Sequence, residues 1–251
     1  MDKYDHSLFF VDAVSREKAL FAKDELRHAL AALRLDIHGT LKATDGKGNI
    51  YDCTMLPESP ASGEARVIAA VKSARPSPDI HVYIGLPDRD AFEKAMADLA
   101  AMGAARIIPL ICSYCQNKWW EDWDKHAGRL RRKMIAGIKQ SLNPWLPELA
   151  RPLPFGRSEA ALRAYHAHGC LVADSGGIPL SRALNALPAE SPAACVIGPP
   201  GGFSPEESDR LKAGGCVFVN IAPYRLRTEL AAVVLCAAMV QAFSSCESCT
   251  T

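Results

Sequence analysis

Two loop segments near the C-terminus contain the residues whose types and spacing could carry out chemistry. In the first, an apolar run breaks into 198–202 (Gly-Pro-Pro-Gly-Gly), which we call the glycine loop. Paired glycines let a ligand approach the backbone closely, since no Cβ stands in the way. In the second, the apolar run 217–221 ends before Arg225, Arg227 and Glu229. A guanidinium there could hold a phosphate or an oxygen that gains negative charge, and a carboxylate could handle a proton.

Alternating strands and helices are expected to position these two loops. From residue 80 onward, short apolar runs alternate with helical patterns, which indicates βαβ units around a mostly parallel sheet. We predict the last strands over 194–198 and 217–221 and the last helix over 228–243. Ser204 followed by Pro205 and two glutamates predicts a helix start with Ser204 as its N-cap. Open α/β sheets bind ligands at the carboxyl ends of neighbouring strands, so we expect the two loops to form one site.

The N-terminal part has the pattern of a small β-rich domain. The segment 45–49 (Asp-Gly-Lys-Gly-Asn) between two apolar runs predicts a hairpin. The proline-containing segment 73–78 changes the composition abruptly, so we place the domain boundary there, with domains 1–76 and 77–251. In the first domain we predict a helix over 15–33 and strands over 7–11, 40–44, 50–55 and 65–72.

Composition and charge narrow the class of protein. The chain has 251 residues, of which 49% are hydrophobic and 23% charged, as in an ordinary globular protein. A formal net charge of +1 argues against bulk coating of nucleic acid, so any RNA contact must come from local basic patches. No apolar stretch reaches the roughly 20 residues needed to span a bilayer, and no secretory signal pattern is present. We expect a cytoplasmic protein with no membrane contact.

The nine cysteines are odd in number and scattered, which fits a reducing compartment. Two Cys-x-x-Cys pairs stand out, Cys112 with Cys115 and Cys246 with Cys249. Together they could form a four-thiolate zinc site, or one pair could have a redox role. The pairs are far apart, however, and the second lies in a Ser/Thr-rich terminus of the kind that frays. We therefore expect no metal.

Two C-terminal motifs match the pattern of a known family. The first reads Ile-Gly-Pro-x-Gly-Gly-Phe-Ser over 197–204, and the second reads Leu-Arg-Thr-Glu-x-Ala over 226–231. Together they resemble the motifs of the ribosomal RNA small subunit methyltransferase E family. The resemblance covers nearly the whole chain. Further matching segments, in the expected order, are His28, Leu33-Arg34, 45–51, 107–109, 139–142 and 146–147.

The resemblance implies a SPOUT-class α/β fold with a mostly parallel sheet, a C-terminal trefoil knot and a small N-terminal PUA-like β-barrel that binds RNA. It implies a homodimer that uses S-adenosylmethionine to methylate N3 of a uridine in 16S rRNA. The partner would be 16S rRNA or the small ribosomal subunit. By carry-over, the cofactor pocket would consist of Ile197, Gly198, Gly202, Ile221, Ala222, Pro223, Arg225 and Leu226, with a weaker third edge from 171–174.

The resemblance also suggests roles in catalysis. Loss of the uracil N3 proton leaves negative charge near O2 and O4, so a nearby cation or base would help. We expect Arg227 to hold that charge and Glu229 to position or accept the proton. The alternative is that Arg227 and Glu229 form a structural ion pair at the start of the last helix.

Candidate RNA contacts come from basic and aromatic residues. The predicted helix 123–141 carries a basic run, and its charges either contact RNA or form a solvated face. The candidate RNA-binding residues are Arg34, Arg129, Arg132 and Lys133. The tryptophans just before or at the start of this helix could stack bases, or they could belong to the core or a dimer interface. These are Trp119, Trp120 and Trp123.

The chain differs from the family pattern at several positions. Pro200 replaces a glutamate, Ala222 a glycine and Leu230 a threonine, and the segment 98–103 lacks the usual charges. These differences support an alternative, a non-catalytic knotted paralogue that binds RNA or S-adenosylmethionine without methyl transfer. A further alternative is a methyltransferase that modifies another RNA.

Overall fold

The computed structural model describes residues 7–22, 25–26, 39–76, 78–116, 118–165, 169–188 and 192–247. The chain divides into two compact units, Met1–Arg75 with Ile135–Leu146, and Pro76–Met134 with Pro147–Thr251. The domain boundary after residue 76 stays a prediction. Nothing in the sequence pattern indicates that residues 135–146 group with the first unit. Their contacts explain it, since Leu146 N donates to Gly46 O at 2.9 Å.

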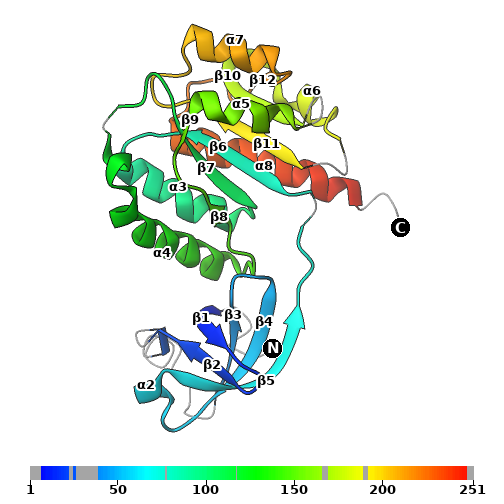
Figure 1. The fold of residues 1–251 in the computed structure, drawn as a ribbon. Helices are drawn as coiled ribbons and strands as arrows, with labels where there is room; N and C mark the ends of the chain where they lie inside the picture. The colour runs from blue at the N-terminus through cyan, green and yellow to red at the C-terminus, as the bar shows by residue number, and fades with distance from the viewer. Residues whose placement is uncertain are drawn as a thin grey trace. The chain divides into compact units, whose positions relative to one another are not determined.

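The first unit contains a closed five-stranded barrel (Figure 1). The strands run in the order β1-β2-β5-β4-β3, and β1 pairs with β3 in parallel to close the barrel. Phe9, Leu41 and Met55 are among the residues buried inside it. The predicted small N-terminal barrel is confirmed. Its elements are β1 (Leu8–Val14), β2 (Lys18–Phe21), β3 (Thr40–Thr44), β4 (Asn49–Met55), β5 (Glu64–Lys72) and the short helix α2 (Ser59–Ser62).

The predicted helix over 15–33 is wrong, because Lys18–Phe21 forms strand β2. Ala19 and Phe21 are buried while Lys18 and Leu20 are exposed, which is the two-residue alternation of a strand. Ser15 N donates to the Lys18 carbonyl at 2.8 Å, and Lys18 N donates to Ser15 Oγ at 3.1 Å. Ser15 therefore closes a turn between two strands instead of capping a helix. Residues 27–38, with the candidate Arg34, lie outside the described residues.

The second unit contains a seven-stranded sheet in which every pairing between described strands is parallel. The order is β12-β10-β11-β6-β7-β8, and β9 also pairs with β7. All five residues of β11 are buried, as expected for a parallel strand covered on both faces. The predicted mostly parallel sheet is confirmed. The strands are β6 (Ile80–Gly85), β7 (Arg106–Ile111), β8 (Glu148–Leu149), β9 (Leu153–Pro154), β10 (Cys170–Pro179), β11 (Ala193–Ile197) and β12 (Val217–Asn220).

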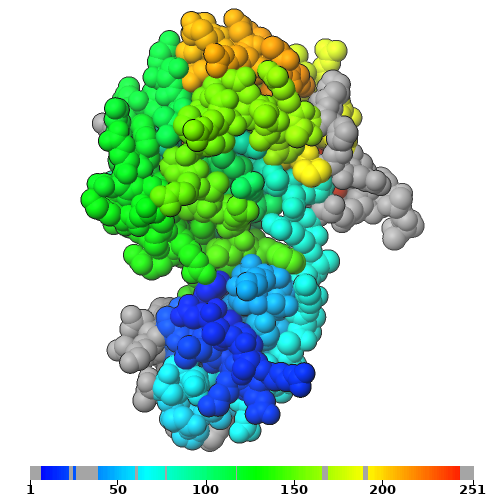
Figure 2. All heavy atoms as spheres, in the orientation of Figure 1, coloured from blue at the N-terminus to red at the C-terminus, as the bar shows by residue number. Residues whose placement is uncertain are grey.

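Helices cover both faces of this sheet (Figure 1). Helix α8 (Thr228–Glu247) packs on β6, β11 and α3 (Arg89–Ala101) on one face. On the other face, α5 (Phe155–Arg163) and α7 (Pro205–Ala213) bury Phe155 and Leu211 against Tyr83 and Val196. Figure 2 shows α5 and α7 side by side at the surface, where Arg210 bonds Glu159 at 3.1 Å. The other helices are the 3₁₀ helix η1 (Trp119–Asp122), α4 (Trp123–Ser141) and α6 (Leu180–Leu184).

One expected neighbour relation is wrong: β11 and β12, which precede the two loops, are separated by β10. Strand β10 pairs with β11 through Val172 and with β12 through Ala173, and it pairs with β12 again from Ile178. Sequence order alone does not reveal such a crossover. Across the described part of the chain, no helix is long and apolar enough to cross a membrane.

Candidate functional site

The two predicted loops lie at the same edge of the sheet. Strands β10, β11 and β12 are parallel, so their carboxyl ends lie together. The glycine loop follows β11, and residues 221–227, which we call the arginine loop, follow β12. A third segment, 174–177, leaves the ladder between β10 and β12 at this edge. The predicted cofactor residues are thus divided between the first two loops, Ile197, Gly198 and Gly202 at one and Ile221, Ala222, Pro223, Arg225 and Leu226 at the other.

Hydrogen bonds join the two loops directly. Arg225 Nη2 donates to the Pro200 carbonyl at 2.7 Å. Thr228 Oγ1, at the start of α8, donates to the Gly198 carbonyl at 3.1 Å. The structure therefore brings the two sequence motifs together. Because Arg225 uses the backbone of Pro200, a proline at this position preserves the contact.

The glycine loop has a backbone shape that depends on glycine. Gly202 has φ of +79°, and a Cβ built there would meet nothing within 4 Å. Its N–H donates to the Pro199 carbonyl at 2.7 Å, which closes a tight turn. A Cβ at Gly198 would lie only 3.2 Å from the Gly202 carbonyl carbon. The loop thus folds tightly on itself and exposes backbone to open space at Gly202.

Two further glycines shape this edge, and sequence reasoning missed both. A Cβ at Gly85, the last residue of β6, would lie 2.3 Å from Pro199 N, so the end of β6 lies directly against the glycine loop. A Cβ at Gly177 would lie 2.4 Å from the Phe218 carbonyl carbon. The signals in the sequence are a glycine at the end of the apolar run 80–85 and a Gly-Gly pair at 176–177, and both equally fit an ordinary turn.

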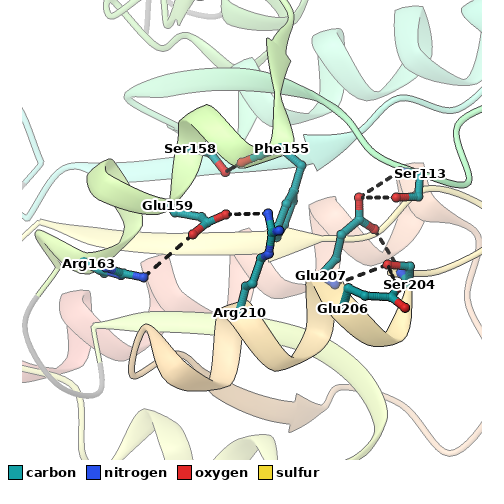
Figure 3. A network of polar contacts seen from close by, with 9 residues as sticks. All are labelled: Ser113, Phe155, Ser158, Glu159, Arg163, Ser204, Glu206, Glu207 and Arg210. Atoms are coloured by element: carbon teal, nitrogen blue, oxygen red, sulfur yellow. Dashed lines mark hydrogen bonds and ion pairs between the residues drawn. The ribbon is translucent and has the colours of Figure 1, made fainter.

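A buried carboxylate anchors the far end of the glycine loop (Figure 3). Ser204 is the N-cap of α7, as predicted: Ser204 N donates to Glu207 Oε2 at 2.9 Å, and Glu207 N donates to Ser204 Oγ at 3.2 Å. The other carboxylate oxygen accepts from Ser113 N at 2.8 Å and Ser113 Oγ at 3.1 Å. Glu207 is only 6% exposed. It therefore links the glycine loop to the segment after β7.

Arg227 and Glu229 lie beside this edge without pairing. Arg227 is exposed, and Glu229 is half-buried in the first turn of α8. Both residues are described, and no ion pair joins them. The alternative that they form a structural ion pair is therefore not found. Their assigned roles in catalysis stay a prediction.

The basic residues of α4 divide into two kinds. Arg129 Nε bonds Glu93 Oε2 at 2.8 Å, and the Glu93 side chain is only 5% exposed. Arg132 and Lys133 are exposed. Arg129 thus has a structural partner, while the other two present charge to solvent. Whether any of the three binds RNA stays a prediction.

The tryptophans before α4 pack within the protein. Trp119 stacks on Trp123 with ring centroids 6.0 Å apart, and it contacts Phe92 of α3. Trp119 Nε1 donates to the Pro87 carbonyl at 3.0 Å. Trp123 is buried, and Trp120 is half-buried. These contacts favour the core interpretation over base stacking for Trp119 and Trp123.

Outside these loops, the described residues offer no metal site, and an apolar hollow found there is separate from both loops. Within the described ranges, no three His, Cys, Asp or Glu side chains are grouped closely enough to hold a metal ion. Cys249 of the second Cys-x-x-Cys pair lies outside them. An apolar hollow of about 350 Å³ lies between α6 and strands β10 and β12, and its lining residues include Leu171 and Val217. It shares no residue with the glycine loop or the arginine loop.

Comparisons with known proteins find a matching family and relatives that span most of the chain. A family model described as an RNA methyltransferase domain matches residues 75–240. The ribosomal RNA small subunit methyltransferase E of Mycobacterium bovis is 26% identical over 231 residues, covering 90% of this chain and 88% of the relative.

Solved structures share the fold over both units. A ribosomal RNA small subunit methyltransferase E from Neisseria gonorrhoeae, bound to S-adenosyl methionine, superimposes with a TM-score of 0.76 at 19% identity, covering 94% of this chain and 97% of that one. A putative methyltransferase from Legionella pneumophila, in complex with the same cofactor, gives 0.75 at 22% identity, with the same coverage.

Proposed function

The chain belongs to the RNA methyltransferase domain family, and from that premise we propose that it methylates ribosomal RNA with S-adenosylmethionine, at N3 of a uridine in 16S rRNA. The observation that carries the proposal is the pair of joined loops at the carboxyl edge of the sheet. The Mycobacterium bovis relative matches over most of its length and carries the name of a small subunit rRNA methyltransferase. The Neisseria and Legionella structures contain S-adenosyl methionine, which supports the choice of cofactor, and we assign it to the two joined loops.

The residues at this edge fit S-adenosylmethionine. Gly202 leaves backbone open to a ligand, and Arg225 fixes the glycine loop by its bond to Pro200. We assign the adenosine part to backbone groups of the glycine and arginine loops, which tolerate side-chain changes such as Ala222. When bound, the cofactor supplies a methyl group on a sulfonium, which makes a good leaving group without a metal.

The chain's own residues act on the uracil ring. Arg227, exposed and not paired with Glu229, holds the negative charge that N3 deprotonation places on O2 and O4. Glu229, half-buried in the first turn of α8, positions or accepts the N3 proton. N3 lies on the Watson–Crick edge, so the target uridine must be unpaired when it is bound.

The finer parts of the assignment follow from the family resemblance. We propose that the barrel is PUA-like and contacts RNA, that the C-terminal strands and α8 form a trefoil knot, and that two subunits pair. The substrate is 16S rRNA, free or in the small ribosomal subunit, which places the protein in the cytoplasm.

The first test is calorimetric titration with S-adenosylmethionine, using a matched pair of glycine variants. Gly202 and Gly103 both have positive φ with no atom near a built Cβ, but Gly103 follows α3. Alanine at either site strains the backbone by about 1–2 kcal/mol. We expect one site per chain, weakened about ten-fold or more, about 1.4 kcal/mol, in Gly202→Ala and unchanged in Gly103→Ala. Equal S-adenosylmethionine affinity in the two variants would show that the cofactor does not bind at the glycine loop.

The second test is methyl transfer to unmodified 16S rRNA and to reconstituted small subunits. A methyl group on N3 blocks base pairing, so reverse transcription should stop one nucleotide before the modified uridine. Stops at another base type would replace the uridine assignment. Cofactor binding without transfer to either substrate would favour the non-catalytic paralogue.

A further inference from the structure

The Cys-x-x-Cys segment after β7 has no role in the proposed transfer, yet it lies against the glycine loop. Cys112 is buried, at 6% exposure, and Cys115 is half-buried. Cys115 N donates to the Cys112 carbonyl at 3.1 Å, which closes a β-turn with Ser113 and Tyr114 at its centre. The turn is part of the second unit, as is the glycine loop.

The turn brings the two thiols within reach of each other. A β-turn holds its first and last Cα atoms less than about 7 Å apart, and a disulfide needs about 4.4–6.8 Å. Cys112 N donates to Cys115 Sγ at 3.2 Å. Both thiols also lie at the Leu110 carbonyl, which accepts from Cys115 Sγ at 3.5 Å and from Cys112 Sγ at 4.0 Å. In a second thiol pair, the Sγ atoms of Cys170 and Cys216 lie 3.1 Å apart, but both residues are buried. Of these two pairs, only Cys112 and Cys115 have thiols close to each other and one member, Cys115, that solvent can reach.

We propose that Cys112 and Cys115 form a reversible dithiol–disulfide site, with Cys115 as the attacking thiol and Cys112 as the resolving one. The Cys115 thiolate attacks one sulfur of a low-molecular-weight disulfide such as oxidised glutathione. Its S–S bond breaks, one glutathione thiolate leaves, and a mixed disulfide forms on Cys115. Cys112 then gives its proton to solvent and attacks Cys115 Sγ, releasing the second glutathione. The protein loses two electrons and two protons, and the disulfide reagent is reduced to two thiols.

The surroundings of the two sulfurs fit this order of events. Hydrogen bonding by Cys112 outweighs burial and lowers the pKa of Cys115 to about 7. The neighbouring Cys115 sulfur, together with burial, raises the pKa of Cys112. The more accessible sulfur is therefore the one with more thiolate at neutral pH, and the thiolate is the reactive form.

The turn contacts the glycine loop, so the oxidation state of Cys112 and Cys115 can affect the shape of that loop. A Cβ at Gly201 would lie 2.8 Å from Tyr114 Cβ, so the backbone of the loop lies against the Tyr114 side chain. Ser113 makes two hydrogen bonds to Glu207, which caps the helix after the loop (Figure 3). Disulfide formation removes both thiol hydrogens, which the Leu110 carbonyl accepts in the reduced form, so we expect Ser113 and Tyr114 between the two cysteines to shift. In a step that rests on the proposed function, we expect oxidation to weaken S-adenosylmethionine binding about three-fold or more.

The test uses the full chain with Cys246→Ser and Cys249→Ser, which removes the other Cys-x-x-Cys pair. The protein is equilibrated with glutathione at several ratios of reduced to oxidised form, quenched in acid, alkylated and mapped by mass spectrometry. We expect a disulfide between Cys112 and Cys115 that reverses with added reduced glutathione. Cys112→Ser should trap glutathione on Cys115, whereas Cys115→Ser should leave Cys112 unmodified.

Two results would overturn the site: no internal disulfide at any ratio, or equal glutathione labelling of the two single variants. Titration of the reduced and oxidised forms with S-adenosylmethionine then separates the two claims. If neither form binds, the proposed function fails while the disulfide site stands. If both bind equally, the connection to the glycine loop is wrong.

Discussion

At the residue scale, two arginines two positions apart do different work. Arg225 donates a hydrogen bond from its guanidinium group to the Pro200 carbonyl, and this bond maintains the shape of the glycine loop. Arg227 is exposed and makes no ion pair with its neighbour Glu229. Arg225, which holds the glycine loop, should affect cofactor affinity. Arg227, which we propose contacts the uracil, should affect the methyl-transfer step. Kinetics can distinguish the two roles.

We expect Arg227→Ala to abolish methyl transfer while S-adenosylmethionine affinity stays within a few-fold. Arg225→Ala should weaken that affinity about ten-fold, about 1.4 kcal/mol, and retain transfer at saturating cofactor. Single-turnover transfer and calorimetric titration measure the two effects. Unchanged turnover in Arg227→Ala would exclude it from charge stabilisation, and a matching loss in both assays for both variants would show a shared structural role.

The residues that the sequence could not indicate are those whose role depends on a distant segment. Gly202 and Arg227 stand in recognisable motifs, so their positions beside the site could be predicted. Gly85 is needed because Pro199 approaches it, and Ser113 matters because Glu207 faces it. Neither pairing has a local signature, since the partners are far apart in the chain. Such contacts become visible only in the folded sheet.

At the scale of elements, the start of α7 fixes the glycine loop. Glu207 accepts hydrogen bonds from Ser204 N, Ser113 N and Ser113 Oγ, and it is buried. We expect Glu207→Ala to lower the free energy of unfolding by about 2–3 kcal/mol, because the buried Ser204 N and the two Ser113 donors lose their charged acceptor. Asp209→Ala, at an exposed position of the same helix, should change it little. Urea unfolding measures both, and equal stability of the two variants would contradict the anchoring role.

Local pattern predicted most elements but failed where tertiary pairing decides. The alternation of β2 spans only Lys18–Phe21, too short to outweigh the helical pattern read over 15–33. Strands β8 and β9 have two residues each and exist only because β7 lies beside them. The capping box at Ser204 could be predicted because its signal is contained in four consecutive residues.

At the scale of the whole molecule, charge constrains how RNA can be bound. With 29 basic and 28 acidic residues, the chain has no general attraction for a polyanion. The barrel and the parallel sheet could be predicted from pattern and resemblance, but not which charges are already paired. Arg129 and Arg132 look alike in the sequence, and only the structure shows that the first bonds the buried Glu93.

The difference between the paired Arg129 and the exposed Arg132 and Lys133 predicts how RNA binding by α4 variants depends on salt. Arg132→Ala and Lys133→Ala remove exposed charges, so each should weaken RNA binding and reduce the slope of log affinity against log salt by about one. Arg129→Ala should mainly lower the unfolding temperature, because Glu93 loses its closest cation. Fluorescence anisotropy with a 16S rRNA fragment at several salt concentrations, with thermal unfolding alongside, checks the contrast. If the Arg132 and Lys133 variants keep the wild-type slope, this face of α4 is a solvated surface, and the phosphate contacts must be sought on the barrel.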